Sequence, residues 1–233
     1  MKYLSFKTVK VALHRIVNDE YPMEHRTSTV GNSLLANYFP LQKYTVTPEQ
    51  EIPYSRKKPD FTVERLDNND NLVYHAIAEM KSYDGANFTK IIDQVYDSIM
   101  PYAEATGGNF SVYVIAIKGV SIGFFQFFNC IPLLDALNIP HYKGFIPLNK
   151  LMLAHDYMSV HNISNIVDYF QHLRLSRVNM YLYRYRLRDV KMPDGMDFPC
   201  IFNLLNEKHE NYVHDLFVHM ANNTPETYMF TQN

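Results

Sequence analysis

The sequence predicts an α/β protein with a three-layer α/β/α core around a central mixed sheet, followed by a mainly helical C-terminal extension. Two strand-like segments, 61–66 and 72–81, flank a run of turn-forming residues and therefore indicate a β-hairpin. An amphipathic segment at 88–105 has apolar residues at helical spacing. Two apolar segments, 110–117 and 121–128, complete the order of hairpin, crossover helix and two further strands.

Composition indicates one domain over residues 1–233, with a core at about 25–150 and a C-terminal elaboration at about 151–233. Hydrophobic residues make up 47% of the chain, enough for a sizeable core. The formal net charge of −2 argues against a protein that coats nucleic acid, although it allows a local basic cleft. Cys130 and Cys200 are expected to be free thiols in a reducing compartment.

We expect an intracellular location, cytoplasmic or nuclear, because no signal peptide or transmembrane segment is recognisable. The segment 110–134 carries a single charge, Lys118, and has the length of a membrane span. A lysine near the middle of a span costs about 2.5–3.5 kcal/mol, and β-branched and aromatic residues dominate the segment. Two buried strands joined at residues 118–121 therefore fit it better.

Other parts of the chain show weaker signals. Residues 41–58 are expected to form an irregular connection, and residues 142–147 a short strand. Apolar periodicity predicts helices at 7–17, 27–38, 131–137, 160–175 and 206–220.

The hairpin carries the residues most suited to chemistry. Asp60 follows Pro59 at the entrance of its first strand, and Glu79 and Lys81 share one face of its second strand because side chains alternate. Two carboxylates form a hard oxygen site that suits Mg²⁺ or Mn²⁺. A neighbouring lysine could orient or deprotonate a water molecule, or stabilise charge on a phosphate.

The pattern Pro59-Asp60, eighteen residues, Glu79-Met80-Lys81 resembles the motif of the PD-(D/E)xK nuclease superfamily, which has the restriction-endonuclease-like fold. The resemblance implies that Asp60 and Glu79 are metal-binding carboxylates. It further implies that the Met80 backbone carbonyl is another ligand and that Lys81 is the catalytic lysine. The predicted order of hairpin, helix and two further strands is also the core order of this fold, so the resemblance covers about residues 25–130 in organisation.

The resemblance suggests accessory residues on two helices. A helix before the hairpin often supplies an extra acid in this family, and Glu20 and Glu24 are the candidates. The helix after the hairpin often places a glutamine or lysine near the metal, which points to Gln94 and Lys90. The alternative for each residue is an ordinary polar side chain on a helix surface.

Two basic stretches are candidates for nucleic-acid binding. The first is the run Arg56, Lys57 and Lys58 just before the hairpin, which could neutralise phosphates or form a solvated surface. The second alternates between arginine and tyrosine, so that a strand would present Arg184, Arg186 and Arg188 on one face. Arginines contact phosphates and tyrosines stack on bases, but an edge strand with tyrosines on the core fits this pattern equally.

These observations predict a metal-dependent nuclease that hydrolyses phosphodiester bonds with Mg²⁺ or Mn²⁺, with DNA favoured over RNA. The partner would be nucleic acid rather than a membrane, and a homodimer would supply two sites for double-strand cleavage. One alternative is a non-catalytic module that keeps the fold to bind nucleic acid or protein. Another is an unrelated α/β protein in which Glu79 and Lys81 form an ion pair on a strand.

Overall fold

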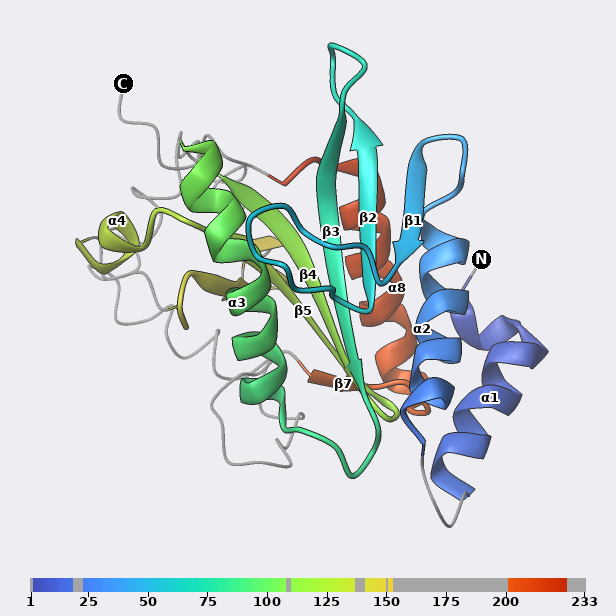
Figure 1. Ribbon diagram of the computed structural model, residues 1–233. Helices are drawn as coiled ribbons and strands as arrows, with labels where there is room; N and C mark the ends of the chain where they lie inside the picture. The colour runs from blue at the N-terminus through green and yellow to red at the C-terminus, as the bar shows by residue number, and fades with distance from the viewer. Residues whose placement is uncertain are drawn as a thin grey trace, which may run out of the picture.

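The computed structural model describes residues 2–18, 23–107, 110–136, 141–149, 151–152 and 201–225 (Figure 1). The predicted helix at 160–175 lies outside these residues. The predicted strand with Arg184, Arg186 and Arg188 lies outside them as well, and so does Glu20.

A seven-stranded mixed sheet forms the centre of the molecule (Figure 1). Along the sheet the strands follow their sequence order: β1 (Tyr44–Pro48), β2 (Phe61–Leu66), β3 (Leu72–Lys81), β4 (Ser111–Lys118), β5 (Ser121–Phe128) and β6 (Phe145–Pro147). A short strand, β7 (Ile201–Asn203), also pairs with β5. Strands β3 and β4 are parallel, whereas the other named pairs are antiparallel. The connection between the parallel pair is α3 (Phe88–Thr106), as the crossover prediction requires.

The β2–β3 hairpin has the predicted strand bounds, and its turn is held by Asp67. The Asp67 Oδ1 atom accepts hydrogen bonds from the backbone N–H groups of Asn69 and Asn71 at 2.7 and 2.9 Å. Asp70 occupies the left-handed region with φ of 61°, which aspartate tolerates better than most residues. The local turn chemistry therefore sets the hairpin before any packing is considered.

Helices cover both faces of the sheet, so the predicted α/β class and mixed sheet are confirmed (Figure 1). Three helices pack on one face: α1 (Lys7–Asn18), α2 (Glu24–Tyr38) and α8 (Glu207–Asn222). Ala76, Ala78 and Met80 of β3 belong to that cluster, whereas Ile77 packs with α3 on the other face. Two smaller elements are a 3-10 helix, η1 (Tyr3–Ser5), and α4 (Ile131–Ala136).

The prediction that residues 41–58 are irregular is wrong for the five residues that form β1. Residues Tyr44–Pro48 pair along β2, with Val46 opposite Val63. The β-branched run Thr45-Val46-Thr47 was the local signal, but its partner lies beyond a connection of twelve residues, 49–60. Helix α2 also starts at Glu24, three residues before the predicted start at Thr27.

The apolar segment 110–134 forms strands β4 and β5 and the beginning of α4. No helix within the described ranges is long and apolar enough to cross a membrane.

The C-terminal helix α8 belongs to the main core. Its buried face consists of Val213, Leu216, Phe217 and Met220. The Phe217 ring stacks on Tyr38 of α2 with 4.4 Å between centroids, and the Tyr3 hydroxyl donates to the Leu204 carbonyl at 3.0 Å. Residues at the two ends of the chain therefore meet on one face of the sheet.

Candidate functional site

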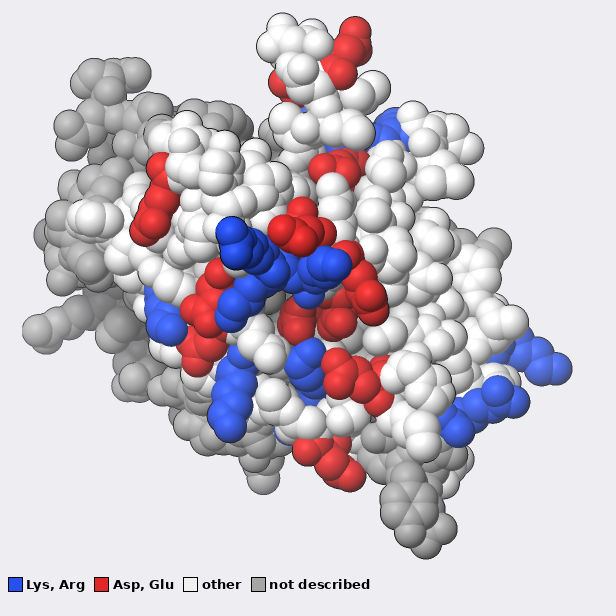
Figure 2. Space-filling model, viewed as in Figure 1, with Lys and Arg blue, Asp and Glu red and all other residues white. Residues whose placement is uncertain are grey.

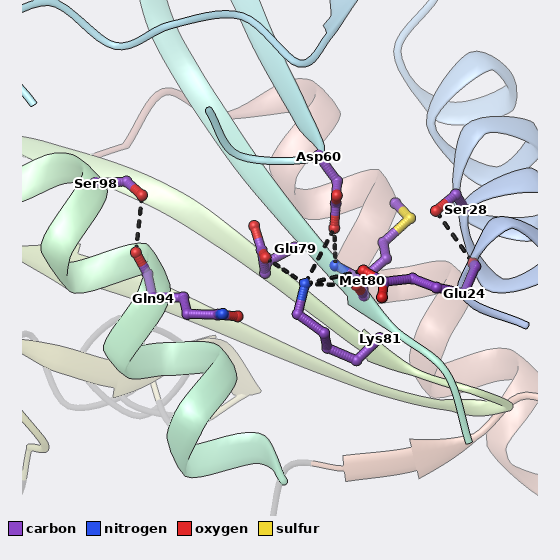
Figure 3. Close-up of polar contacts among 8 residues, drawn as sticks. All are labelled: Glu24, Ser28, Asp60, Glu79, Met80, Lys81, Gln94 and Ser98. Atoms are coloured by element: carbon purple, nitrogen blue, oxygen red, sulfur yellow. Dashed lines mark hydrogen bonds and ion pairs between the residues drawn. The ribbon is translucent and has the colours of Figure 1, made fainter. Parts of the chain in front are cut away.

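Asp60, Glu79 and Lys81 meet near the carboxyl end of β3, beside the parallel strand β4 (Figure 3). The hairpin register places them there, because Phe61 pairs with Ala78 and the preceding Asp60 therefore lies next to Met80. The Asp60 Oδ2 atom accepts a hydrogen bond from the Met80 backbone N–H at 2.5 Å. Asp60 thus stays tied to β3 although it precedes β2.

The Lys81 ammonium is the centre of the cluster, and we call this group the Lys81 cluster: Glu24, Asp60, Glu79, Met80 and Lys81. The Lys81 Nζ atom lies 2.7 Å from Glu79 Oε1 and 3.1 Å from the Met80 carbonyl oxygen. It also lies 3.1 Å from Glu24 Oε1 and 3.9 Å from Asp60 Oδ2. Four oxygen atoms from four residues therefore surround one cation.

Burial raises the pKa of both central carboxyl groups. The Glu79 side chain is 10% exposed, and desolvation together with the nearby Asp60 charge raises its pKa above the usual range. Desolvation likewise raises the pKa of Asp60, although the Met80 N–H and Lys81 partly offset the rise. Both groups therefore hold their negative charge less readily than exposed carboxylates do, and a nearby cation stabilises that charge.

Two opposing effects act on the pKa of Lys81. Burial by itself would lower its pKa, but the hydrogen bond and charge of Glu79, together with Glu24 and Asp60, outweigh burial. The net pKa of Lys81 is raised, so its amine is protonated at neutral pH.

The oxygen atoms of the Lys81 cluster are of the chemical type that a hard divalent cation prefers. Carboxylates and a backbone carbonyl are the ligands that Mg²⁺ and Mn²⁺ prefer, and these oxygens already converge on one positive charge. No group of three His, Cys, Asp or Glu side chains within the described ranges is arranged to hold a metal. Mg²⁺ sites commonly use only one or two carboxylates and complete their shell with water and substrate phosphate.

Among the accessory candidates, Glu24 joins the cluster. It lies in the first turn of α2, and its carboxylate bonds Lys81. Gln94 is exposed on α3, and Figure 3 shows its side-chain amide extending toward the side of β3 that carries Glu79. Lys90 has an exposed side chain, and its backbone N–H donates to Asn87 Oδ1 at the start of α3.

The basic run Arg56, Lys57 and Lys58 is exposed in the connection between β1 and β2. Ile52 anchors this connection by packing fully buried in the cluster around α3. Lys57 Nζ pairs with Asp97 Oδ2 of α3 at 3.2 Å. Figure 2 shows Lys and Arg side chains interspersed with Asp and Glu on this face, so the surface is mixed in charge.

Gly31 is a residue of the site's framework that the sequence-based prediction did not single out. It lies in the middle of α2, and a Cβ atom there would collide with the Met80 side chain. The glycine lets α2 approach β3 closely, which fixes the helix whose first turn carries Glu24. A buried glycine inside a helix pattern is disfavoured without a packing reason, and that was the available signal.

Comparisons with protein-family models, curated proteins and solved structures found no match to this chain.

Proposed function

We propose that this protein is a Mg²⁺- or Mn²⁺-dependent nuclease of the PD-(D/E)xK type, with a restriction-endonuclease-like fold, that hydrolyses phosphodiester bonds of DNA in preference to RNA. The observation that carries the proposal is the convergence of the Asp60, Glu79, Glu24 and Met80 oxygens on the Lys81 ammonium. Separate elements contribute these groups, and they meet at the carboxyl end of a parallel strand pair.

In this proposal Asp60 and Glu79 hold the metal ion, with the Met80 carbonyl as a further ligand. A bound Mg²⁺ or Mn²⁺ supplies charge that polarises the phosphate and lowers the pKa of water. The hydrogen bond from the Met80 N–H fixes the Asp60 carboxylate relative to the Met80 peptide. Desolvation around Glu79 strengthens its attraction to any cation in the site.

The protonation state of Lys81 narrows its role. In the metal-free site the neighbouring carboxylates raise the pKa of Lys81 and keep its amine charged at neutral pH, so we assign Lys81 the role of a hydrogen-bond donor. The ammonium would orient the attacking water and stabilise the charge that develops on the phosphate. Glu24 and Glu79 position it for both tasks through bonds of 3.1 and 2.7 Å.

The first test is cleavage of labelled single- and double-stranded DNA and RNA in Mg²⁺, in Mn²⁺ and in EDTA. We expect metal-dependent cleavage that falls at least about 100-fold in Lys81→Ala, because the lysine stabilises transition-state charge. Lys143→Ala is the matched control, because the Lys143 ammonium also lies 2.7 Å from a carboxylate, Asp93, outside the Lys81 cluster. The control should cleave at the wild-type rate.

Equal cleavage rates in wild type, Asp60→Ala and Lys81→Ala would show that these two residues take no part in the reaction. A specific observation supports the alternative of a non-catalytic binding module, namely that the Lys81 ammonium already satisfies the site carboxylates without any other cation. A folded wild type that binds nucleic acid or protein but cleaves nothing would favour that module.

A further inference from the structure

The connection between β1 and β2 presents an exposed aromatic ring beside basic side chains. Tyr54 is 72% exposed, the largest exposed fraction of any aromatic side chain in the described ranges. Residues 53–58 carry three basic side chains, Arg56, Lys57 and Lys58, and no acidic one. Figure 1 shows this connection crossing in front of the sheet toward α3. We call residues 52–58 the Tyr54 loop.

Hydrogen bonds close the Tyr54 loop and fix its shape. The Ile52 backbone N–H donates to the Lys57 carbonyl at 3.1 Å, and the Ser55 hydroxyl donates to the Ile52 carbonyl at 3.0 Å. The Ser55 Oγ atom also accepts from the Lys57 N–H at 3.1 Å. Two contacts hold the loop on α3, namely the buried Ile52 side chain and the ion pair of Lys57 with Asp97. The groups that the loop presents therefore lose little freedom when a ligand binds.

Two residues of the Tyr54 loop have a costly backbone conformation. Tyr54 and Arg56 lie in the left-handed region, with φ of 69° and 56°. A bulky side chain rarely adopts this conformation, and such strain is typical of segments that bind ligands. Both side chains are exposed, so the folded protein gains no burial from them in return. A partner outside the chain would account for their presentation.

The Tyr54 loop leads directly to the Lys81 cluster. Lys58 lies two residues before Asp60, so the Cα atoms of the two are within about 7.6 Å of each other. Tyr54 lies six residues before Asp60, so the corresponding limit is about 23 Å. A stacked nucleic-acid strand advances about 3.4 Å per nucleotide, so several nucleotides can span this range.

Two of the three basic side chains are available to phosphates along this path. Lys57 is paired with Asp97, whereas Arg56 and Lys58 are exposed. Neither of these two side chains forms a hydrogen bond or ion pair with the part of the chain that the structure describes. The loop therefore combines a free aromatic face with two free positive charges, which is the equipment of sites that bind single-stranded nucleic acid.

We propose that the Tyr54 ring stacks on an unpaired base of the substrate, while Arg56 and Lys58 contact backbone phosphates between that base and the Lys81 cluster. This inference rests on the proposed nuclease function, and it names the substrate as a single strand or a single-stranded segment of a duplex. A paired base presents only its edge in a groove, so its face is closed to the ring. The contact tolerates any sequence, because every base has an aromatic face.

The test compares binding of labelled single-stranded and duplex DNA in EDTA, which prevents metal-dependent cleavage. Tyr54→Asn removes the ring but keeps a residue that tolerates positive φ. We expect this variant to bind single strands about tenfold more weakly and duplex as wild type does. Tyr54→Phe keeps the ring and should bind within about twofold of wild type. The control is Tyr212→Asn, at a 62% exposed tyrosine of α8, on the face of the sheet opposite α3.

An abasic scan makes the assignment specific, because it removes one base at a time and leaves the phosphates in place. One abasic position should weaken the wild type about tenfold and leave Tyr54→Asn unchanged. Arg56→Ala/Lys58→Ala should reduce the slope of log K against log[salt] by about 1.4, as for two lost contacts to a single strand. Tyr54→Asn should keep the wild-type slope, because the ring carries no charge.

The outcomes separate this inference from the nuclease proposal. A wild type that cleaves, while Tyr54→Asn keeps its affinity for single strands, overturns only the stacking assignment. Equal losses on single strands and duplex, or in Tyr54→Asn and Tyr54→Phe, also overturn it, because stacking needs a free base and the ring alone. A wild type that binds single strands through Tyr54 but cleaves nothing in Mg²⁺ or Mn²⁺ overturns only the nuclease proposal. A wild type that binds no nucleic acid overturns both.

Discussion

Strand β3 carries ionisable side chains on both faces of the sheet, and the two faces treat them differently. His75 is fully buried on the face of α2 and α8, where its Nε2–H donates to the Met220 carbonyl at 2.8 Å. The rings of Phe39, Tyr44 and Tyr113 surround it within 5.7 Å between centroids. Four residues later, Glu79 lies on the opposite face against a lysine and two further carboxylates.

This difference separates a side chain with a structural role, His75, from a group of side chains that could bind a ligand, the Lys81 cluster. Burial lowers the pKa of His75 to about 4, so the ring is neutral at physiological pH and acts as a structural hydrogen-bond donor. The Lys81 cluster instead brings three carboxyl groups together around one ammonium, and it reaches solvent through Glu24, whose side chain is 49% exposed. Ionisable groups that are partly desolvated and still accessible are typical of sites that bind a ligand or substrate.

The largest expected effect is a pH dependence of the free energy of unfolding that follows from the buried, neutral His75. Its folded-state pKa of about 4 lies below its unfolded value near 6.5, so the unfolded chain takes up the proton first. The free energy of unfolding should therefore fall by roughly 3 kcal/mol as the pH drops from about 6.5 to about 4. Urea unfolding over this range should show the fall in wild type and a flatter profile in His75→Phe. The exposed His14→Gln variant is the control, and equal profiles in wild type and His75→Phe would contradict a neutral buried ring.

The next effect tests the charge balance of the Lys81 cluster. Lys81→Met removes the cation that three carboxylates share, and it should lower the free energy of unfolding by about 2 kcal/mol at pH 7.5. Millimolar Mg²⁺ should restore part of this loss, since a ligand that binds only the folded state stabilises it. Thermal unfolding with Mg²⁺ or EDTA measures both, with Lys143→Met as the control. A variant as stable as wild type and indifferent to Mg²⁺ would mean that the cluster does not need a cation.

A smaller effect concerns the packing of α2 against the site. Gly31→Ala places a methyl group against the end of the buried Met80 side chain, and because methionine is flexible we expect a loss of about 1 kcal/mol in the free energy of unfolding. The displacement of α2 should also loosen the Glu24–Lys81 contact and reduce any metal-dependent cleavage. Ser33→Ala, on an exposed face of the same helix, serves as control. Wild-type stability in Gly31→Ala would show that Met80 finds another rotamer without cost.

The smallest effect is expected at Lys57. Its ion pair with Asp97 is exposed, with side chains 52% and 55% accessible, so Lys57→Ala should change the free energy of unfolding by less than about 0.5 kcal/mol. If the basic run contacts nucleic acid, the same variant should still weaken binding and reduce its salt dependence. Unchanged binding would assign Lys57 to the solvated surface instead.

Much of the fold could be predicted because its signals are local. The Asp67–Asn71 turn fixes the hairpin, and the periodicity of 88–105 and 206–220 predicts helices that the structure places at Phe88–Thr106 and Glu207–Asn222. The alternation of β3 also correctly predicts that Glu79 and Lys81 share the face of Ile77. Strand β1 escaped prediction because its pairing partner, not its own five residues, makes it a strand.

By itself the sequence determined the hairpin, the crossover helix and the pairing of Glu79 with Lys81, since these depend on residues close together in the chain. The tertiary structure decided which distant groups complete the site. A helix start brings Glu24 to Lys81, 57 residues away, because Gly31 lets α2 pack closely on β3. The tertiary structure also decided on which face of β3 His75 lies. A bulge pairs Val63 with Ala76 and Glu64 with Tyr74, and it leaves His75 as the extra residue. Strict alternation would put His75 on the face of Glu79, so its burial depends on this bulge and on α8, whose residues are more than 130 positions away.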